Sequence, residues 1–259
     1  MKKRTSLIPL LFLSSLANAE SDYSDYVVGQ LVPEKSVVIK SEVAGVVDYY
    51  RYDNGDGVTL GQELLSLSSG DYSLNVELAR NELEVSRAEL DIQEKQLKRY
   101  ESLLKSKGVS ASDVDNQIRV TNIGRAQFNV SNTQYKIAAR KLDKATPDAP
   151  FDGVIINRAV ELGQFISVGD PLFTIADMDR LKVRFHLLEM DFNKFRKGEK
   201  VKVEIPSVEQ ILDGTVTLLS PAFQNSEPGF LVEVTVDNGA GKLNPGMESY
   251  VYFNDEEVM

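Results

Sequence analysis

Side chains that commonly carry out chemistry are scarce in this 259-residue chain. It contains one histidine, His186, and no cysteine, so a transition-metal site would have to rely on carboxylates alone. Phe185 and Leu187 flank His186 in an alternating apolar pattern, which predicts that His186 is an ordinary strand residue. The sequence therefore offers no convincing set of ligands for a transition metal.

A cluster of turn residues at 53–57 has the composition of a calcium-binding loop. Gly55, however, stands where such a loop requires an Asp or Asn ligand, so an ordinary turn is expected. No glycine spacing fits a dinucleotide- or phosphate-binding loop, and no serine lies in a nucleophile elbow. We predict no catalytic residue, no metal site and no cofactor, and we expect that the chain is not an enzyme. A carboxylate site in the C-terminal strands is the enzymatic alternative.

The elements that would position any site are organised around an internal repeat. Residues 45–67 and 153–175 carry the same pattern, 108 positions apart. Identical residues in the first copy and the second are Gly45, Val46, Gly55, Gly61 and Leu64, matching Gly153, Val154, Gly163, Gly169 and Leu172. Two copies are too few for a solenoid. We predict two halves of one β-domain, each unable to bury its apolar face alone, separated by an insert.

The insert has a seven-residue period. Its periodic positions are Val76, Leu83, Leu90, Leu97 and Leu104, then Val114, Thr121, Phe128, Tyr135 and Leu142. This spacing predicts an antiparallel coiled-coil hairpin whose arms reach on the order of 50 Å at ~1.5 Å per residue. The weak intermediate positions indicate a narrow seam and a second, polar contact face. Gly108 is expected to end the first helix, and Ser110 with Asp113 is expected to form a capping box at the start of the second.

The predicted fold class is mixed α and β, elongated and multidomain. A split β-sandwich is interrupted by the α-helical hairpin and followed by a small antiparallel β-barrel, since the C-terminal strands are short and separated by turns. The expected segments are a signal peptide at 1–19, a strand segment joining the barrel at 20–36, sandwich halves at 37–69 and 147–177, the hairpin at 70–146, the barrel at 178–254 and a tail at 255–259.

The N-terminal segment has the features of a secretory signal peptide. It has a basic start, a short apolar core and small residues before an expected cleavage site after Ala19. The apolar core is about half of the roughly 20 residues that a spanning helix needs; retention as an anchor is the alternative. We therefore predict a periplasmic protein. The formal charge of −10 disfavours nucleic acid as a partner, because nucleic-acid binding depends on Lys and Arg.

Five features follow one another along residues 27–254. They are VVIKSEVAGVV with VTLGQELLSL, the heptad hairpin, the hairpin tip, APFDGVIINRAVELGQFISVGDPLFTIAD, and the C-terminal group LKVRFHLLEMD, RKGEKVKVEIP, GTVTLLSP and LNPGM. Together they resemble the periplasmic adaptor subunits, or membrane fusion proteins of the HlyD type, of tripartite efflux pumps. At the tip, Arg99, Leu103 and Ser110 match the family's motif in residue type and spacing.

The resemblance implies a structural conduit, and it implies that the split β-sandwich is lipoyl-like. Arg99, Leu103 and Ser110 would contact a TolC-like outer-membrane channel, and the barrel would dock on an inner-membrane transporter of the resistance–nodulation–division (RND) type. Copies would assemble as a ring of six, with no covalent lipoylation. An adaptor of an ABC-type exporter is the alternative, a type I secretion adaptor ranks third, and a lipoyl- or biotinyl-type carrier domain is a rival from a different class.

Overall fold

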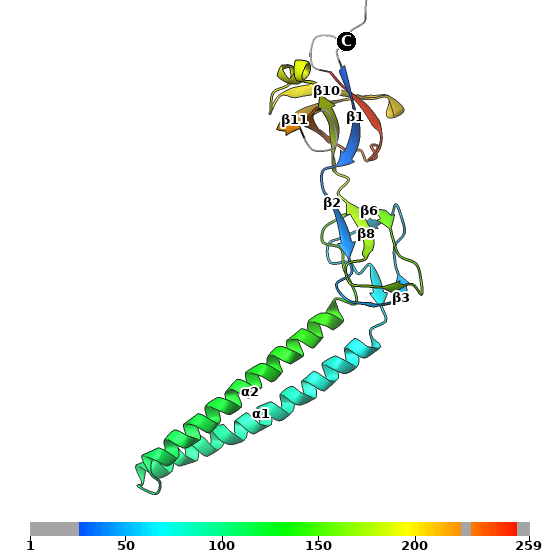
Figure 1. Cartoon of the computed structure of the whole chain (residues 1–259). Helices are drawn as coiled ribbons and strands as arrows, with labels where there is room; N and C mark the ends of the chain where they lie inside the picture. The colour runs from blue at the N-terminus through cyan, green and yellow to red at the C-terminus, as the bar shows by residue number, and fades with distance from the viewer. Residues whose placement is uncertain (1–25, 224–228, 253–259) are drawn as a thin grey trace, which may run out of the picture.

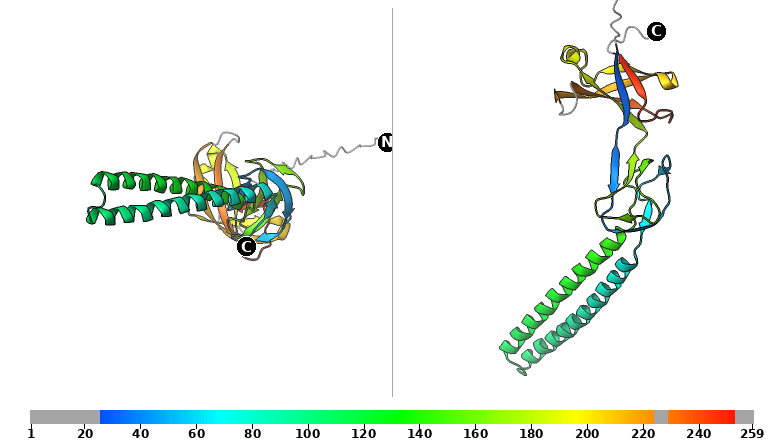
Figure 2. Two further views of the ribbon diagram at one scale, coloured as in Figure 1. Left: turned by 90° about the horizontal axis from the view of Figure 1, so that it is seen from below. Right: turned by 45° about the vertical axis from the view of Figure 1, so that its right-hand side comes forward.

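The structure is a computed structural model that describes residues 26–223 and 229–252. The predicted signal peptide and the predicted tail lie outside these ranges. A β-barrel, a β-sandwich and a helical hairpin follow one another along an elongated molecule (Figure 1). The further views in Figure 2 show the same order, with the hairpin projecting from the sandwich on the side away from the barrel. This architecture confirms the predicted fold class.

Two long helices form the hairpin. Helix α1 spans Gly70–Lys105 and helix α2 spans Ala111–Asp143, so each arm extends about 50 Å at ~1.5 Å per residue. The buried residues of the seam are Val76, Ala79, Ser86 and Leu90 from α1 and Val114, Thr121 and Ser131 from α2. The heptad spacing therefore indicated the correct faces, although the seam is narrow and contains small polar side chains.

Polar contacts cross the seam in its tip-proximal half. The Gln117 side-chain amide donates to Oε1 of Gln93 over 2.9 Å, and the Thr121 hydroxyl lies 3.3 Å from the carbonyl of Gln93. Glu94 pairs with Arg125 of the facing helix at 2.7 Å. Because these polar groups are satisfied within the hairpin, they fix its register.

The turn between the helices differs from the expected glycine stop. Lys107, with φ 59°, takes the left-handed conformation that had been expected at Gly108. The N–H of Lys107 donates to the carbonyl of Leu104 at 3.0 Å and that of Gly108 to the carbonyl of Leu103 at 2.8 Å, which is the Schellman pattern. The helix thus ends one residue earlier than the glycine alone suggested, since these backbone bonds hold Lys107 in its strained conformation.

The sandwich contains seven short strands in two sheets. The strands are β2 (Ser36–Lys40), β3 (Gly45–Tyr50), β4 (Gly57–Val58), β5 (Leu65–Leu67), β6 (Gly153–Arg158), β7 (Phe165–Ile166) and β8 (Pro171–Ala176). The sheet orders are β2-β8-β6-β4 and β5-β3-β7. Each sheet therefore contains strands from both halves of the repeat.

The two halves exchange strands with matching geometry. Strand β4 of the first half pairs with β6, and β7 of the second half pairs with β3. The N–H of Gly55 donates to the carbonyl of Ile155 at 2.8 Å. In the equivalent bond of the other half, the N–H of Gly163 donates to the carbonyl of Val47 at 2.9 Å. A single apolar core is filled from both halves. Neither half can bury its apolar face without the other, as the repeat predicted.

The hairpin leaves and rejoins the sandwich at one point. The N–H of Leu67, just before α1, donates to the carbonyl of Ala145, just after α2, at 2.8 Å. The hydroxyl of Tyr72 in α1 donates to the carbonyl of Ala44 at 2.6 Å. Both Leu67 and Ala145 are fully buried. The base of the hairpin is thus joined to the sandwich core.

Six strands close the barrel in the order β1-β13-β10-β11-β12-β9. They are β1 (Tyr26–Pro33), β9 (Arg180–Leu187), β10 (Lys200–Ile205), β11 (Gln210–Phe223), β12 (Phe230–Asp237) and β13 (Glu248–Tyr252), with short 3-10 helices at Glu189–Lys194 and Pro206–Val208. Strand β1 belongs to the barrel although β2, which begins three residues after β1 ends, belongs to the sandwich. The chain therefore passes between barrel and sandwich twice.

One tyrosine of the barrel is expected to titrate abnormally. The Tyr252 hydroxyl donates to Oε2 of Glu204 at 2.5 Å, and this hydrogen bond, with burial and the negative charge of Glu204, raises the pKa of Tyr252 to about 12. Because the folded-state pKa lies above the ordinary value of about 10, the interaction stabilises the fold below pH ~10 and is lost as the pH rises through the folded pKa. Ultraviolet titration of the wild type and Tyr252→Phe should differ by one phenol ionising near pH 12. A difference near pH 10 would contradict this.

Candidate functional site

The three residues of the tip motif all lie at the free end of the hairpin. Arg99 and Leu103 occupy the last two turns of α1, one helical turn apart, and Ser110 is the residue that caps α2. All three are exposed. The tip is the part of the hairpin farthest from the barrel (Figure 1). The fold therefore presents the motif at one extremity of the molecule.

Ser110 has a defined local role in addition to its exposure. Its side chain accepts the N–H of Asp113 at 3.2 Å, its hydroxyl donates to the Asp113 carboxylate at 2.6 Å, and its own N–H donates to that carboxylate at 3.0 Å. This confirms the predicted capping box. The hydrogen bonds from the Ser110 side chain and backbone lower the pKa of Asp113 below its usual range. The start of α2 is thus held in one conformation.

The tip also exposes apolar surface that the heptad pattern did not indicate. Leu104 is a seam residue by its spacing, but it is 38% exposed, as is Leu103. The facing helix begins only at Ala111, so Leu104 lies level with the first residue of α2 and no turn of α2 extends beyond it toward the tip. Two exposed leucines about one helical turn from the exposed Arg99 suit contact with another protein, because arginine and apolar groups together are typical of interface centres.

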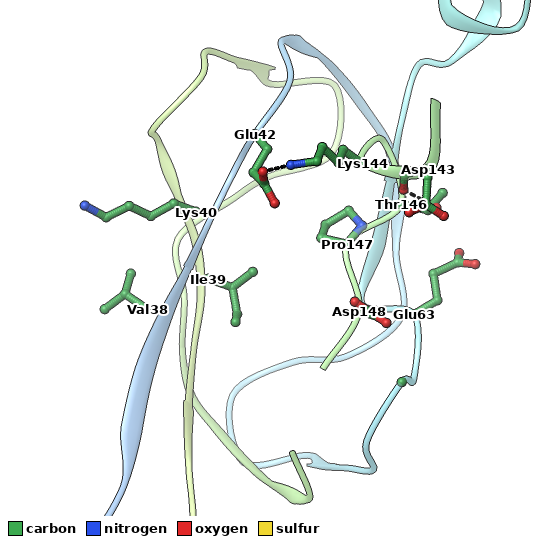
Figure 3. Close-up of a pocket in the computed structure, with 11 residues that line it drawn as sticks. Val38, Ile39, Lys40, Glu42, Glu63, Asp143, Lys144, Thr146, Pro147 and Asp148 are labelled. Atoms are coloured by element: carbon green, nitrogen blue, oxygen red, sulfur yellow. Dashed lines mark hydrogen bonds and ion pairs between the residues drawn. The ribbon is translucent and has the colours of Figure 1, made fainter. Parts of the chain in front are cut away.

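A hollow at the junction of hairpin and sandwich has a volume of about 570 Å³ and an acidic lining (Figure 3). Its carboxylates come from Glu42, Glu63, Asp143 and Asp148. Glu42 pairs with Lys144 across the hollow. In the part of the chain that the structure describes, no group of three or more His, Asp or Glu residues is arranged to hold a metal ion. The lining includes residues of β2, of the end of α2 and of the segment that follows α2, so the hollow lies where the hairpin joins the sandwich.

Glu233 of the barrel is a buried carboxylate with two cationic partners. Burial raises the pKa of Glu233, but hydrogen bonds from Lys182 and Arg184 lower it by more, so that the net pKa lies below the ordinary value. The Lys182 Nζ donates to Oε2 of Glu233 at 2.9 Å, and the Arg184 Nη2 donates to Oε1 of Glu233 at 2.7 Å. These three residues lie on the neighbouring strands β9 and β12. These contacts link β9 to β12 across the sheet.

The helices in the described ranges fall short of what crossing a membrane demands, either in length or in apolar character. Both arms of the hairpin are instead rich in charged side chains.

Comparison with known proteins identifies the family to which the chain is similar. Residues 35–177 match the family model described as the CzcB-like, barrel-sandwich hybrid domain. The cobalt-zinc-cadmium resistance protein CzcB of Cupriavidus metallidurans is 26% identical over 224 residues, which are 83% of this chain and 41% of CzcB. The multidrug resistance protein MdtA of Xenorhabdus bovienii is 26% identical over 174 residues, which are 66% of this chain and 42% of MdtA.

A solved structure shares the architecture. The crystal structure of a MacA–MexA chimeric protein, which contains the α-hairpin domain of Pseudomonas aeruginosa MexA, has a TM-score of 0.70 and 20% identity, covering 89% of this chain and 82% of the chimera. The chain spans about half the length of the curated relatives it matches, with 55%, 42% and 41% of three of them covered. The family model spans both halves of the sandwich and the whole hairpin. The chain therefore belongs to the family of the CzcB-like, barrel-sandwich hybrid domain.

Proposed function

We propose that this protein is the periplasmic adaptor of a tripartite efflux pump, joining an inner-membrane RND-type transporter to a TolC-like outer-membrane channel. The observation that carries the proposal is the placement of the tip motif and the barrel at opposite ends of one elongated chain. The protein acts by holding two partners in register, and the chain supplies no chemical step. The resistance functions in the names of CzcB and MdtA support an efflux role.

The hairpin of α1 and α2 forms a rod, and this rod supplies the distance between the two partners. Each arm is about 50 Å long, and the sandwich and barrel extend the molecule further in the opposite direction (Figure 1). The Leu67–Ala145 hydrogen bond joins the rod to the sandwich core, so a load at the tip reaches folded β-structure directly. Six copies in a ring around a duct give such rods a common axis.

The tip is assigned to the channel and the barrel to the transporter. Arg99, Leu103 and Ser110 make the channel contact, and the exposed strands of the barrel face the inner membrane. An adaptor for an ABC-type exporter would also bind the channel with its tip and the transporter with its barrel. The identity of the captured transporter therefore distinguishes an RND pump from an ABC pump. An RND transporter has no nucleotide-binding domain, whereas an ABC exporter has one.

Site-specific photo-cross-linking in cells tests this assignment. A photoreactive residue in place of Leu103 should capture an outer-membrane protein, and one in place of Ile211, which is 49% exposed on β11, should capture the transporter. A photoreactive residue at the exposed Arg87, midway along α1, is the matched control and should capture neither membrane partner. Capture of the channel from Ile211, or of no membrane protein from Leu103 in exporting cells, would overturn the proposal.

A further inference from the structure

Each helix of the hairpin carries a second apolar stripe that points away from the seam. In α1 the stripe is Leu78, Val85 and Ile92, which are 57%, 60% and 62% exposed; in α2 it is Ile123, Val130 and Ile137, which are 58%, 50% and 49% exposed. Each residue follows a seam position by two, which turns it by roughly 200° about the helix axis. The two stripes therefore lie on opposite edges of the hairpin. These positions differ from the intermediate heptad positions on which the expectation of a second, polar contact face was based.

The two stripes are level with one another along the rod. The Arg80 guanidinium lies over the Tyr135 ring, which sets Leu78, two residues earlier, opposite Ile137, two residues later. Nearer the tip, Gly124 lies against Leu90, which sets Ile92 at the height of Ile123.

Val85 and Val130 fall midway between these anchor points, because all six residues repeat every seven positions. A single hairpin cannot bring the stripes together, since they face outward from different helices. A second hairpin beside it in the same orientation can.

The charges beside the stripes distinguish which helices meet. Residues 71–94 of α1 contain seven acidic and two basic side chains, and residues 119–143 of α2 contain five basic and one acidic. Without Glu94 and Arg125, which pair with each other across the seam, α1 keeps six acidic and α2 four basic side chains. Contact between α1 of one copy and α2 of the next joins an acidic edge to a basic edge. Contact between two α1 helices would place acidic edges together, and like charges at an interface are unfavourable.

The base of the α2 stripe supports the same pairing. A hollow of about 460 Å³ lies there. Its lining includes the exposed apolar residues Ile137 and Val168, the cationic residues Arg140 and Lys141, and Lys144, which is paired with Glu42 of the same lining. An acidic, apolar helix edge such as that of α1 matches this lining in both charge and hydropathy.

We propose that the α1 stripe of one copy packs against the α2 stripe of the next copy, in the same orientation and without axial shift, so that Leu78 meets Ile137, Val85 meets Val130 and Ile92 meets Ile123. This inference rests on the self-association included in the proposed function and specifies its surface. The contact is head-to-tail between two different edges, which is the type of interface that generates rings.

Disulfide mapping tests the pairing, since the natural chain has no cysteine. Full-length Leu78→Cys and Ile137→Cys proteins, mixed and oxidised, should form a covalent dimer. Leu78→Cys mixed with Val130→Cys is out of step by seven residues, or about 10 Å, and should yield about tenfold less, since a disulfide requires Cα atoms within ~7 Å. The second control is Glu84→Cys mixed with Asn129→Cys. Each of these residues lies one position before a stripe residue, off the proposed contact, so this mixture should also yield little dimer.

Each result decides the matter. Dimers only in the level mixture support the inference, and a chain carrying both Leu78→Cys and Ile137→Cys should then give a ladder that ends at the ring size. Leu78→Cys alone cross-linking as well as the mixture would overturn it in favour of an α1–α1 contact. Absence of the level cross-link in cells that still export would overturn the inference while leaving the proposed function intact. Cross-links that form without capture of a channel from the tip would refute the proposed function alone.

Discussion

Replacing Arg99 by aspartate is expected to lower export about tenfold or more, because arginine is a frequent hot spot and its loss costs at least ~1.4 kcal/mol of binding, or one decade. The unfolding temperature should not change. Arg99 is exposed near the end of α1, so its charge can be reversed without disturbing the seam or the Ser110 cap. Efflux in cells expressing the variant, and calorimetry of the purified protein, measure the two quantities.

The control for this prediction is Arg87→Asp. Arg87 lies on the same helix and is also exposed to solvent, so the substitution makes the same change of charge away from the tip. Export should be retained. If Arg99→Asp lowers the unfolding temperature in proportion to export, the residue is structural and the assignment of the tip as a channel contact fails.

The change Gly153→Ala is expected to lower the free energy of unfolding of the sandwich by about 3 kcal/mol, at the upper end of overpacking effects. A Cβ at Gly153 would lie 2.5 Å from the backbone oxygen of Ala176 and 3.0 Å from the Ile175 side chain. Backbone on the paired strand β8 cannot yield without breaking the β6–β8 ladder. Calorimetric unfolding of the full chain measures the loss.

The repeat supplies matched controls. Gly45 is the equivalent of Gly153 in the first half, but a Cβ there would meet the Leu67 Cβ at 3.1 Å, so Gly45→Ala should cost about 1 kcal/mol. A methyl group added at Gly57 would have no neighbouring atom within 4 Å, so Gly57→Ala should leave stability nearly unchanged. Equal losses at Gly45 and Gly153 would show that the close approach at β8 does not determine the effect.

The internal repeat, the heptad spacing and the capping motif predicted the architecture. The repeat indicated a two-part sandwich because the same glycines recur at the same turns, such as Gly55 and Gly163, which both have positive φ, 94° and 77°. The heptads indicated the hairpin, and Ser110 with Asp113 indicated where α2 begins. These features depend on local chemistry and on periodicity, both of which are visible in residue types.

The sequence did not indicate features of one helix that depend on how the facing helix packs against it. The exposure of Leu104 follows from where α2 begins, and the Glu94–Arg125 pair follows from the register of the hairpin, so neither could be deduced from α1 alone. The strained residue of the turn is Lys107 because of the hydrogen bonds around it. The roles of Arg99, Leu103 and Ser110 at a channel remain predictions, since they require a second protein.

The single attachment point of the hairpin, with Leu67 bonded to Ala145, makes rod length an independent variable. Inserting or deleting seven residues in each arm changes the reach by about 10 Å and returns every side chain to its former angular position. Such a step preserves the seam and both outer edges while leaving the sandwich untouched. An adaptor of this design can therefore be lengthened or shortened in fixed increments to suit envelopes of different thickness.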